Sequence, residues 1–286
     1  MPCYARASAE LRARSGARTA RGRRPAGGTA LYVYGLIRTP GVDLGHVGIE
    51  VDGRPERVYT LAMGSVGAAV SHYGSRERIL PIRRNLEAHH RVVRDLMKLD
   101  GGVLPMRFGH VVTGEPELVR LVADQREDIE EELADLAGKT EMSLKVFWDV
   151  ENIYDYFVHR DSTILEMRDR LFGDGSEPNR EQKIELGRMF ADRLAEDRET
   201  HLHQVTEVLE DCVEDIEQDD ARTERMVMNL ALLAEKARLA ELDRRVGEAA
   251  GRFSGLYVFK YAGPFAPYHF VGLDLDVPAR TSASGR

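Results

Sequence analysis

The sequence is poor in cysteine and has no long apolar run. Its only cysteines are Cys3 and Cys212. Two cysteines exclude a disulfide framework and a zinc site made of cysteines alone, and they are typical of a reducing compartment. No apolar segment approaches the roughly 20 residues that a membrane helix needs. We therefore expect a cytoplasmic protein that neither spans a membrane nor has one as its partner.

Motifs for enzymatic chemistry are also missing. The sequence contains no G-x-x-x-x-G-K-[ST] phosphate loop, no G-x-G-x-x-G after its first strand, no G-x-S-x-G elbow and no H-E-x-x-H zinc motif. Without them no recognised catalytic motif is present. We therefore expect no cofactor and no bound metal.

Positive charge is scarce outside the first 29 residues. The net charge is -8, yet residues 1–29 hold seven arginines and a single acid. The rest of the chain is strongly acidic, and we expect no nucleic-acid partner because phosphate contacts need clustered Lys and Arg. Residues 1–29 have little to bury, so we expect a disordered Arg-rich tail. That tail reads as a solvated extension, a basic arm for acidic partners or nucleic acid, or an organelle address.

The 286 residues suffice for one large or two ordinary domains. In the first half, apolar runs predict strands, Gly64-Ser65 predicts a hairpin turn, and 3.6-residue periodicity predicts helices. Pro105 suggests that the strand containing it lies at a sheet edge or a bulge. The predicted strands are 31–37, 57–63, 66–73 and 103–112, and the predicted helices are 84–100 and a segment from 115 that Gly138 ends.

The same order of elements then restarts. Asn179 and Gln182 form a weak capping-box signal, and no proline interrupts 179–263, so long helices are permitted there. Two α+β units are therefore expected, each an antiparallel sheet with helices on one face, and the second has a long helical insertion. The predicted strands are 142–148, 226–234 and 255–261, and the predicted helices are 151–171, one beginning near 179, and 236–251.

Possible metal or redox groups have plainer explanations. Glu87-x-x-His90 is a single copy of a spacing that di-iron bundles need twice. Glu199, His203 and Glu207 share a helix face and could hold a divalent ion, but such rows are usually solvated. Cys212 lies in the acidic run 207–220, where a thiol pKa is raised. That run holds eight acids and no Lys or Arg, and it reads as a solvated surface or a face for a basic partner.

Two segments are candidates for binding a partner. The strand VLPMRFGHVV (103–112) places Arg107 and Phe108 in an apolar run, where a structural ion pair of the arginine is the plainer alternative. The segment GPFAPYHFV (263–271) gathers Phe265, Tyr268 and Phe270 between prolines. Clustered aromatics are common in domain contacts and in interface hot spots alike, so both readings stay open.

At these residues the chain resembles the gas vesicle accessory proteins of the GvpF/GvpL family. The matching pieces occur in the family's order over about residues 31–275 and end on the G-P-x-x-P-Y-x-F pattern at 263–270. Residues 1–29 and the tail after 277 depart from it. The pieces are LYVYGLI (31–37), VLPMRFGHV (103–111), LKVFWD (144–149), MVMNLALLAE (226–235) and GPFAPYHFV (263–271).

The resemblance implies an α+β fold of two ferredoxin-like α/β domains, 30–138 and 139–275, the second with a long helical insertion, followed by a disordered tail at 276–286. It implies a non-catalytic, minor structural protein of gas vesicle assembly. Its expected partners are the small hydrophobic shell protein, at the gas-facing side, and other accessory proteins. Arg107, Phe108, Phe265, Tyr268 and Phe270 are the candidate contact residues.

Two other classes of function remain. Paired ferredoxin-like domains could form a regulatory module that binds a small molecule, which a ligand-dependent rise in melting temperature would reveal. An enzyme using a metal at Glu199, His203 and Glu207 is the third possibility, which metal analysis of the purified protein would test.

Overall fold

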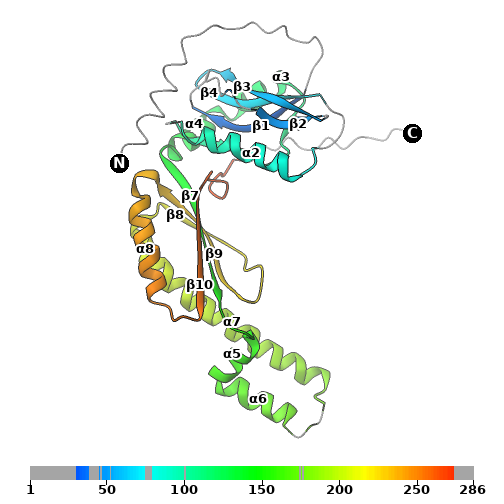
Figure 1. Cartoon of the computed structure of the whole chain (residues 1–286), viewed down its shortest axis with the longest axis vertical. Helices are drawn as coiled ribbons and strands as arrows, with labels where there is room; N and C mark the ends of the chain where they lie inside the picture. The colour runs from blue at the N-terminus through cyan, green and yellow to red at the C-terminus, as the bar shows by residue number, and fades with distance from the viewer. Residues whose placement is uncertain are drawn as a thin grey trace, which may run out of the picture. The chain divides into compact units, whose positions relative to one another are not determined.

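The computed structural model describes residues 30–38, 45, 47–51, 53–74, 79–99, 101–173, 175 and 177–273. Both predicted tails, 1–29 and 276–286, lie outside these residues. The chain forms an α+β fold with two antiparallel sheets, and the described residues contain seven α-helices (Figure 1). It divides into two compact units. The first holds the residues up to Gly138 together with those from Ala266, and the second is Lys139–Phe265.

The sheet of the first unit is built around β1 (Ala30–Ile37). This strand is apolar along its whole length because it lies inside the sheet and is buried on both faces. The strand order is β2-β3-β4-β1-β5, with β6 also paired to β1. The remaining strands are β2 (Val47–Val51), β3 (Arg54–Met63), β4 (Val66–Tyr73), β5 (Val103–Pro105) and β6 (Val111–Val112).

Helix α2 (Arg83–Leu96) packs its apolar side on this sheet and confirms the predicted helix. Two other predictions for this unit were wrong. Residues 103–112 form two short strands, because the loop between them turns at Gly109, whose φ is 93°. The helix expected from 115 to Gly138 is two helices, α3 (Glu115–Asp124) and α4 (Arg126–Asp135), because the backbone leaves helical geometry at Gln125.

The sheet of the second unit has the order β10-β7-β9-β8. Its interior strand β9 (Met226–Glu235) is buried at every position except the last, which confirms the predicted strand 226–234. Strand β8 (Asp215–Asp219) lies inside the acidic run and was not predicted. The other two strands are β7 (Lys139–Trp148) and β10 (Tyr257–Phe265).

The helices of this unit include one long helix, α7 (Arg180–Leu209). It begins at the predicted capping box, since Asn179 and Gln182 bond each other's backbone N–H groups. Helix α8 (Leu239–Gly251) follows the short 3₁₀ turn η2 (Lys236–Arg238). The single helix predicted over 151–171 is instead α5 (Ile153–Arg160) and α6 (Ser162–Phe172). The break falls at Asp161, an extended residue whose carboxylate caps α6.

The second unit ends earlier than the sequence suggested. The sequence predicted a second domain that runs to residue 275, whereas the chain returns to the first unit at Ala266. The reason is packing: Ala266 is buried in the core of the first unit, and Tyr268 packs against that core. None of the helices among the described residues is both long and apolar enough to cross a bilayer.

Candidate partner-binding site

Two of the candidate residues meet in the first unit around His89, a buried residue of α2. The ring centre of Phe108 lies 5.8 Å from that of His89. The hydroxyl of Tyr268 lies 3.2 Å from Nε2 of the same histidine. The fold thus gathers the loop between β5 and β6 and the segment after β10 onto one side chain, although 179 residues separate His89 from Tyr268.

His89 is held on both ring nitrogens. The hydroxyl of Tyr32 lies 2.8 Å from Nδ1, opposite the contact with Tyr268. Burial, together with the neighbouring His90, lowers the pKa of His89 to about 4. The imidazole is therefore neutral near pH 7, with one nitrogen donating and the other accepting. This arrangement is a satisfied polar centre in a core, and it presents no reactive group to solvent.

The segment 266–273 is attached to the first unit at a second point. The backbone N–H of Gly272 donates to Oε1 of Glu132 in α4. Burial raises the pKa of Glu132, while this hydrogen bond acts in the opposite direction. Two polar contacts and the buried Ala266 thus fix the segment. Tyr268 serves internal packing, which was one of the two readings of the aromatic segment.

The other three candidates lie apart from this centre. Arg107 is exposed at the start of the β5–β6 loop. Phe270 is half-buried, and its N–H donates to the carbonyl of Pro267. Phe265 ends β10 in the second unit with 44% of its surface exposed. Arg107 and Phe265 are therefore the candidates that a partner could reach without disturbing a core.

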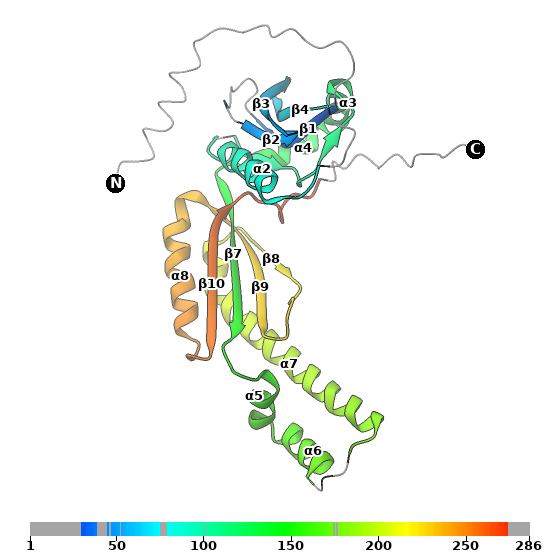
Figure 2. The ribbon, with the colours of Figure 1, turned by 45° about the vertical axis from the view of Figure 1, so that its right-hand side comes forward.

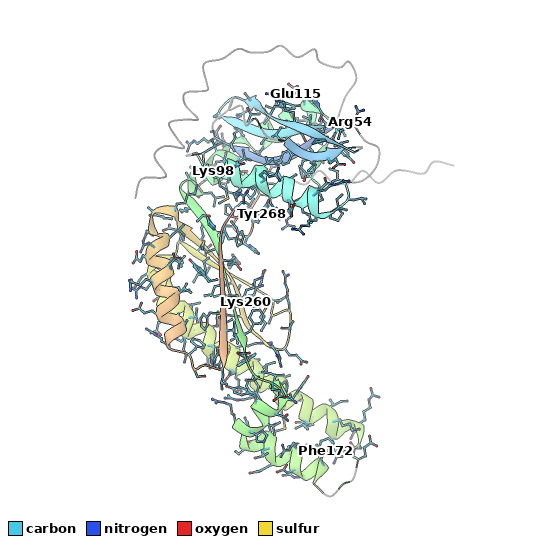
Figure 3. The ribbon with its side chains drawn as sticks, viewed as in Figure 1. Arg54, Lys98, Glu115, Phe172, Lys260 and Tyr268 are labelled. Carbon is cyan, nitrogen blue, oxygen red and sulfur yellow. The ribbon has the colours of Figure 1, made fainter. Side chains whose placement is uncertain are left out.

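Helices α7 and α8 both lie on one face of the second unit's sheet (Figure 2). The other face carries neither of these helices, yet its residues on the central strand β9, such as Asn229 and Ala231, are buried. Phe265 is on this second face, in register with the buried Glu141 of β7. Lys260 of β10, which Figure 3 labels, is exposed on the same face. No pattern in the sequence predicted this surface, although the residues of β10 alternate between half-buried and exposed positions.

An open hollow of about 1210 Å³ lies beside α5 in the same unit. Several of its side chains make contacts within the unit. The hydroxyl of Tyr154 donates to Glu224 at 2.8 Å, and the guanidinium of Arg225 donates to the carbonyl of Glu151. Arg160 lies 5.0 Å over the ring of Tyr156. These contacts hold Tyr154, Arg160 and Arg225 in the wall of the hollow.

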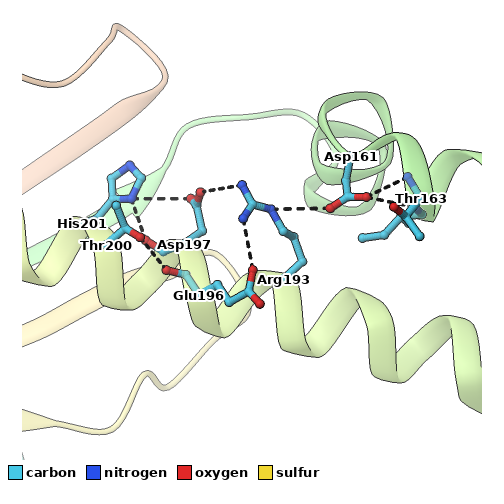
Figure 4. A network of polar contacts seen from close by, with 8 residues as sticks. Asp161, Thr163, Arg193, Glu196, Asp197, Thr200 and His201 are labelled. Carbon is cyan, nitrogen blue, oxygen red and sulfur yellow. Dashed lines mark hydrogen bonds and ion pairs between the residues drawn. The ribbon is translucent and has the colours of Figure 1, made fainter.

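A polar network ties α6 to α7 (Figure 4). Arg193 reaches Asp161 at 3.8 Å and Asp197 at 3.7 Å. His201 lies 3.6 Å from Asp197, and its ring stacks on Tyr257 with centres 4.9 Å apart. The network joins helix to helix and helix to sheet, so its role is structural.

The residues considered as metal ligands and the thiol of Cys212 do not form a site in the described part of the chain. Among the described residues, no three or more His, Cys, Asp or Glu side chains are placed to hold a metal ion. Glu199, His203 and Glu207 are exposed along α7. Cys212 is buried, and burial raises the pKa of its thiol.

Comparison with known proteins gives a consistent result. The family model described as "Gas vesicle synthesis protein GvpL/GvpF" matches residues 30–272. Gas vesicle protein F of Dolichospermum flosaquae is 28% identical over 200 residues, which cover 69% of this chain and 81% of that protein. Gas vesicle protein L1 of Halobacterium salinarum is 26% identical over 258 residues, covering 84% and 89%. None of the relatives is named as an enzyme.

A solved structure has the same fold. The crystal structure of the gas vesicle protein GvpF from Anabaena sp. PCC7120 matches with a TM-score of 0.74 at 24% identity, and the match covers 86% of this chain and 99% of that one. GvpF from Microcystis aeruginosa matches with a TM-score of 0.70 at 24% identity, covering 85% and 98%.

Proposed function

The chain belongs to the GvpL/GvpF family of gas vesicle synthesis proteins, and on that basis we propose that it is a non-catalytic accessory protein and minor structural component of gas vesicle assembly. The observation that carries the proposal is the match of the family model to residues 30–272. The match spans both compact units, so it concerns the whole described chain.

The proposed partners are the small hydrophobic shell protein, contacted at the gas-facing side of the shell, and other accessory proteins. A shell subunit exposes apolar surface before it assembles, and such surface aggregates unless a partner covers it. The second unit supports this role because it exposes several large apolar side chains. Three of them, Leu256, Val258 and Phe265, lie in or next to β10.

We also propose that each unit derives from a ferredoxin-like β-α-β-β-α-β plan. In the second unit, the order β10-β7-β9-β8 places the fourth strand beside the first, then the third and the second. Helices α5, α6 and α7 occupy the place of the first helix, which is the proposed helical insertion. In the first unit, β5-β1-β4-β3 follows the same order, with β2 in the place of the first helix.

Phe265 and Arg107 are the proposed contact residues, with Phe108, Tyr268 and Phe270 supporting their segments.

The test is co-expression of the tagged full chain with the small shell protein, followed by capture. Phe265→Ala should reduce capture about tenfold, the loss that removing one well-buried aromatic anchor causes. Phe172→Ala is the matched control, because Phe172 is 49% exposed at the end of α6. Failure of the folded wild-type chain to capture the shell protein or any accessory protein would refute the proposed binding.

A further inference from the structure

Strand β10 is an edge strand of the second unit's sheet, and it pairs only with β7 (Figure 2). The N–H of Asp149 donates to the carbonyl of Leu256 at 2.7 Å, so these two residues form a hydrogen-bonded pair. In the next pair, Trp148 and Tyr257, the N–H of Trp148 points away from β10 and donates to the carbonyl of Arg225. The two kinds of pair alternate along an antiparallel ladder, so every second residue of β10 directs its backbone groups away from β7. These residues are Tyr257, Phe259 and Tyr261.

The unpaired side of residues 257–262, called the β10 edge below, has defined ends. Past it, the register with β7 shifts between Ala262 and Phe265, and Pro264 has no N–H to donate. Within the described part of the chain, the backbone of 257–262 has hydrogen-bond partners only on β7. The edge is about 20 Å long, and its outward N–H and C=O groups can pair with one further strand.

The two sides of this edge differ in chemistry. The three aromatic side chains named above are half-buried against the core that α8 covers. Val258, Lys260 and Ala262 lie on the other side and are exposed. Lys260 stands opposite Lys145 of β7, and opposed like charges cost free energy unless a partner neutralises them. A strand that fits this edge is therefore apolar on one side and acidic on the other.

The end of the chain contains a segment with this pattern. Residues 273–277 read Leu-Asp-Leu-Asp-Val, and a proline follows them. Apolar and acidic residues alternate with a period of two, which is the period of a strand. If Leu275 pairs beside Phe259, the apolar residues of the segment follow the aromatic row, and one of the two aspartates lies opposite Lys260. The segment thus complements the β10 edge on both sides.

We infer that the β10 edge binds residues 273–277 of a second copy of this chain, which add a further strand to the sheet. Within one chain the segment starts from the first unit, because Glu132 of α4 holds the N–H of Gly272. A second copy brings its own segment to the edge free of that attachment. Each copy offers one edge and one segment, so two copies can exchange them reciprocally.

Lys260 also makes the edge selective. A lysine on an edge strand deters pairing with other chains, because a strand that has no acid opposite it leaves the charge unpaired. The second copy's aspartates remove this obstacle. The inference goes beyond the proposed function and does not depend on it.

Sedimentation velocity of the full chain over a concentration series tests the inference. The wild-type chain should associate reversibly. The edge variant, Lys260→Asp, and the segment variant, Asp274→Lys with Asp276→Lys, should each associate about tenfold more weakly, because opposed charges become alike. A chain carrying all three changes should regain most of that loss, because its opposed charges attract again.

An equimolar mixture of the two variants distinguishes exchange between copies from closure within one chain. The edge variant keeps an intact segment and the segment variant keeps an intact edge. The mixture should therefore associate more strongly than either variant alone. Lys183→Asp is the control, because it makes the same charge change as Lys260→Asp on α7, away from the β10 edge, and should leave association unchanged.

A fluorescently labelled peptide of residues 272–278 tests the edge without any change to the chain. Fluorescence anisotropy should show that it binds the wild-type chain. The same peptide with Asp274→Lys and Asp276→Lys should bind about tenfold more weakly.

Three results would each overturn the inference. They are a wild-type chain that is monomeric at every concentration, a mixture that associates no better than its components, and two peptides that bind equally. If a substituted chain fails to fold, the wild-type concentration series and the two peptides decide the question.

Discussion

The hydroxyl of Tyr268 lies 3.2 Å from Nε2 of His89, which connects the end of the described chain to helix α2 of the first unit. The other nitrogen of His89 is held by Tyr32 of the central strand. One buried imidazole therefore joins three segments of the first unit. Because the ring is neutral in the folded protein, this connection depends on pH.

Acid should destabilise the protein through His89. An unfolded histidine titrates at about 6.5, whereas burial lowers the pKa of His89 to about 4. Between these values the unfolded state binds a proton that the folded state does not, so this contribution is complete above pH 6.5 and is lost as the pH falls through 4. The free energy of unfolding should fall by at most about 3 kcal/mol over that range. Urea unfolding at a series of pH values measures it.

The control for this prediction is His89→Gln, which removes the titrating ring. Carboxylates also titrate in this range, so only the difference between the two pH profiles reports on His89. The variant should be less stable at pH 7 and should lose less stability between pH 6.5 and 4. Parallel profiles would contradict the assignment.

Removing the Tyr268 hydroxyl should weaken the attachment of the C-terminal segment. Tyr268→Phe keeps the ring and loses the hydrogen bond to His89, which should cost about 1 kcal/mol of unfolding free energy. Tyr154→Phe removes a hydroxyl that donates to Glu224 at an exposed site and should cost less than about 0.5 kcal/mol. Chemical denaturation of both variants decides the matter, and equal losses would count against a special role for Tyr268.

Gly102 should not tolerate a side chain. Its φ is 81°, and a Cβ there would lie 2.2 Å from the carbonyl oxygen of Leu133. Gly102→Ala should therefore destabilise the first unit by about 3 kcal/mol or more. Gly247→Ala is the control, because this glycine lies in α8 with open space around it, and alanine should stabilise the helix by about 0.5–1 kcal/mol. Thermal unfolding that ranked the two variants in the opposite order would refute this account of the turn.

Asp161 should matter for the junction between α6 and α7. Its carboxylate accepts the N–H of Thr163 at 2.9 Å and lies 3.8 Å from Arg193. Asp161→Ala should cost about 1 kcal/mol, most of it from the lost helix cap. Asp192→Ala, which removes only an exposed ion pair with Arg188, should change stability by a few tenths of a kcal/mol. Hydrogen exchange of the α6 amides reports the local effect, and unchanged exchange in Asp161→Ala would contradict it.

The sequence predicted elements wherever burial was periodic or continuous. The apolar strand β9 and the capping box of α7 are examples, because each leaves a local pattern. The breaks at Gln125 and Asp161 were missed, because the apolar spacing continues across both residues. Strand β8 was missed because its acids hide the single inward Ile216.

Sites made by distant segments were harder to predict. His89 lies three and seven residues before Val92 and Leu96 on the buried side of α2, and that spacing could have marked it as a core histidine. Its contact with Tyr268 arises only from the return of the chain at Ala266. Its contact with Phe108 comes from the loop between β5 and β6. Which residues of the second unit's sheet lie on the face away from α7 and α8 depends on strand order and register, which no local pattern encodes.

The most direct test of the proposed role in gas vesicle assembly is deletion of this chain from a vesicle-forming cell, followed by electron microscopy. Cells without the chain should form few or no gas vesicles, and the wild-type chain supplied in trans should restore their number. Phe265→Ala should restore fewer vesicles than Phe172→Ala does. A normal number of intact vesicles in cells that lack the chain would contradict the account.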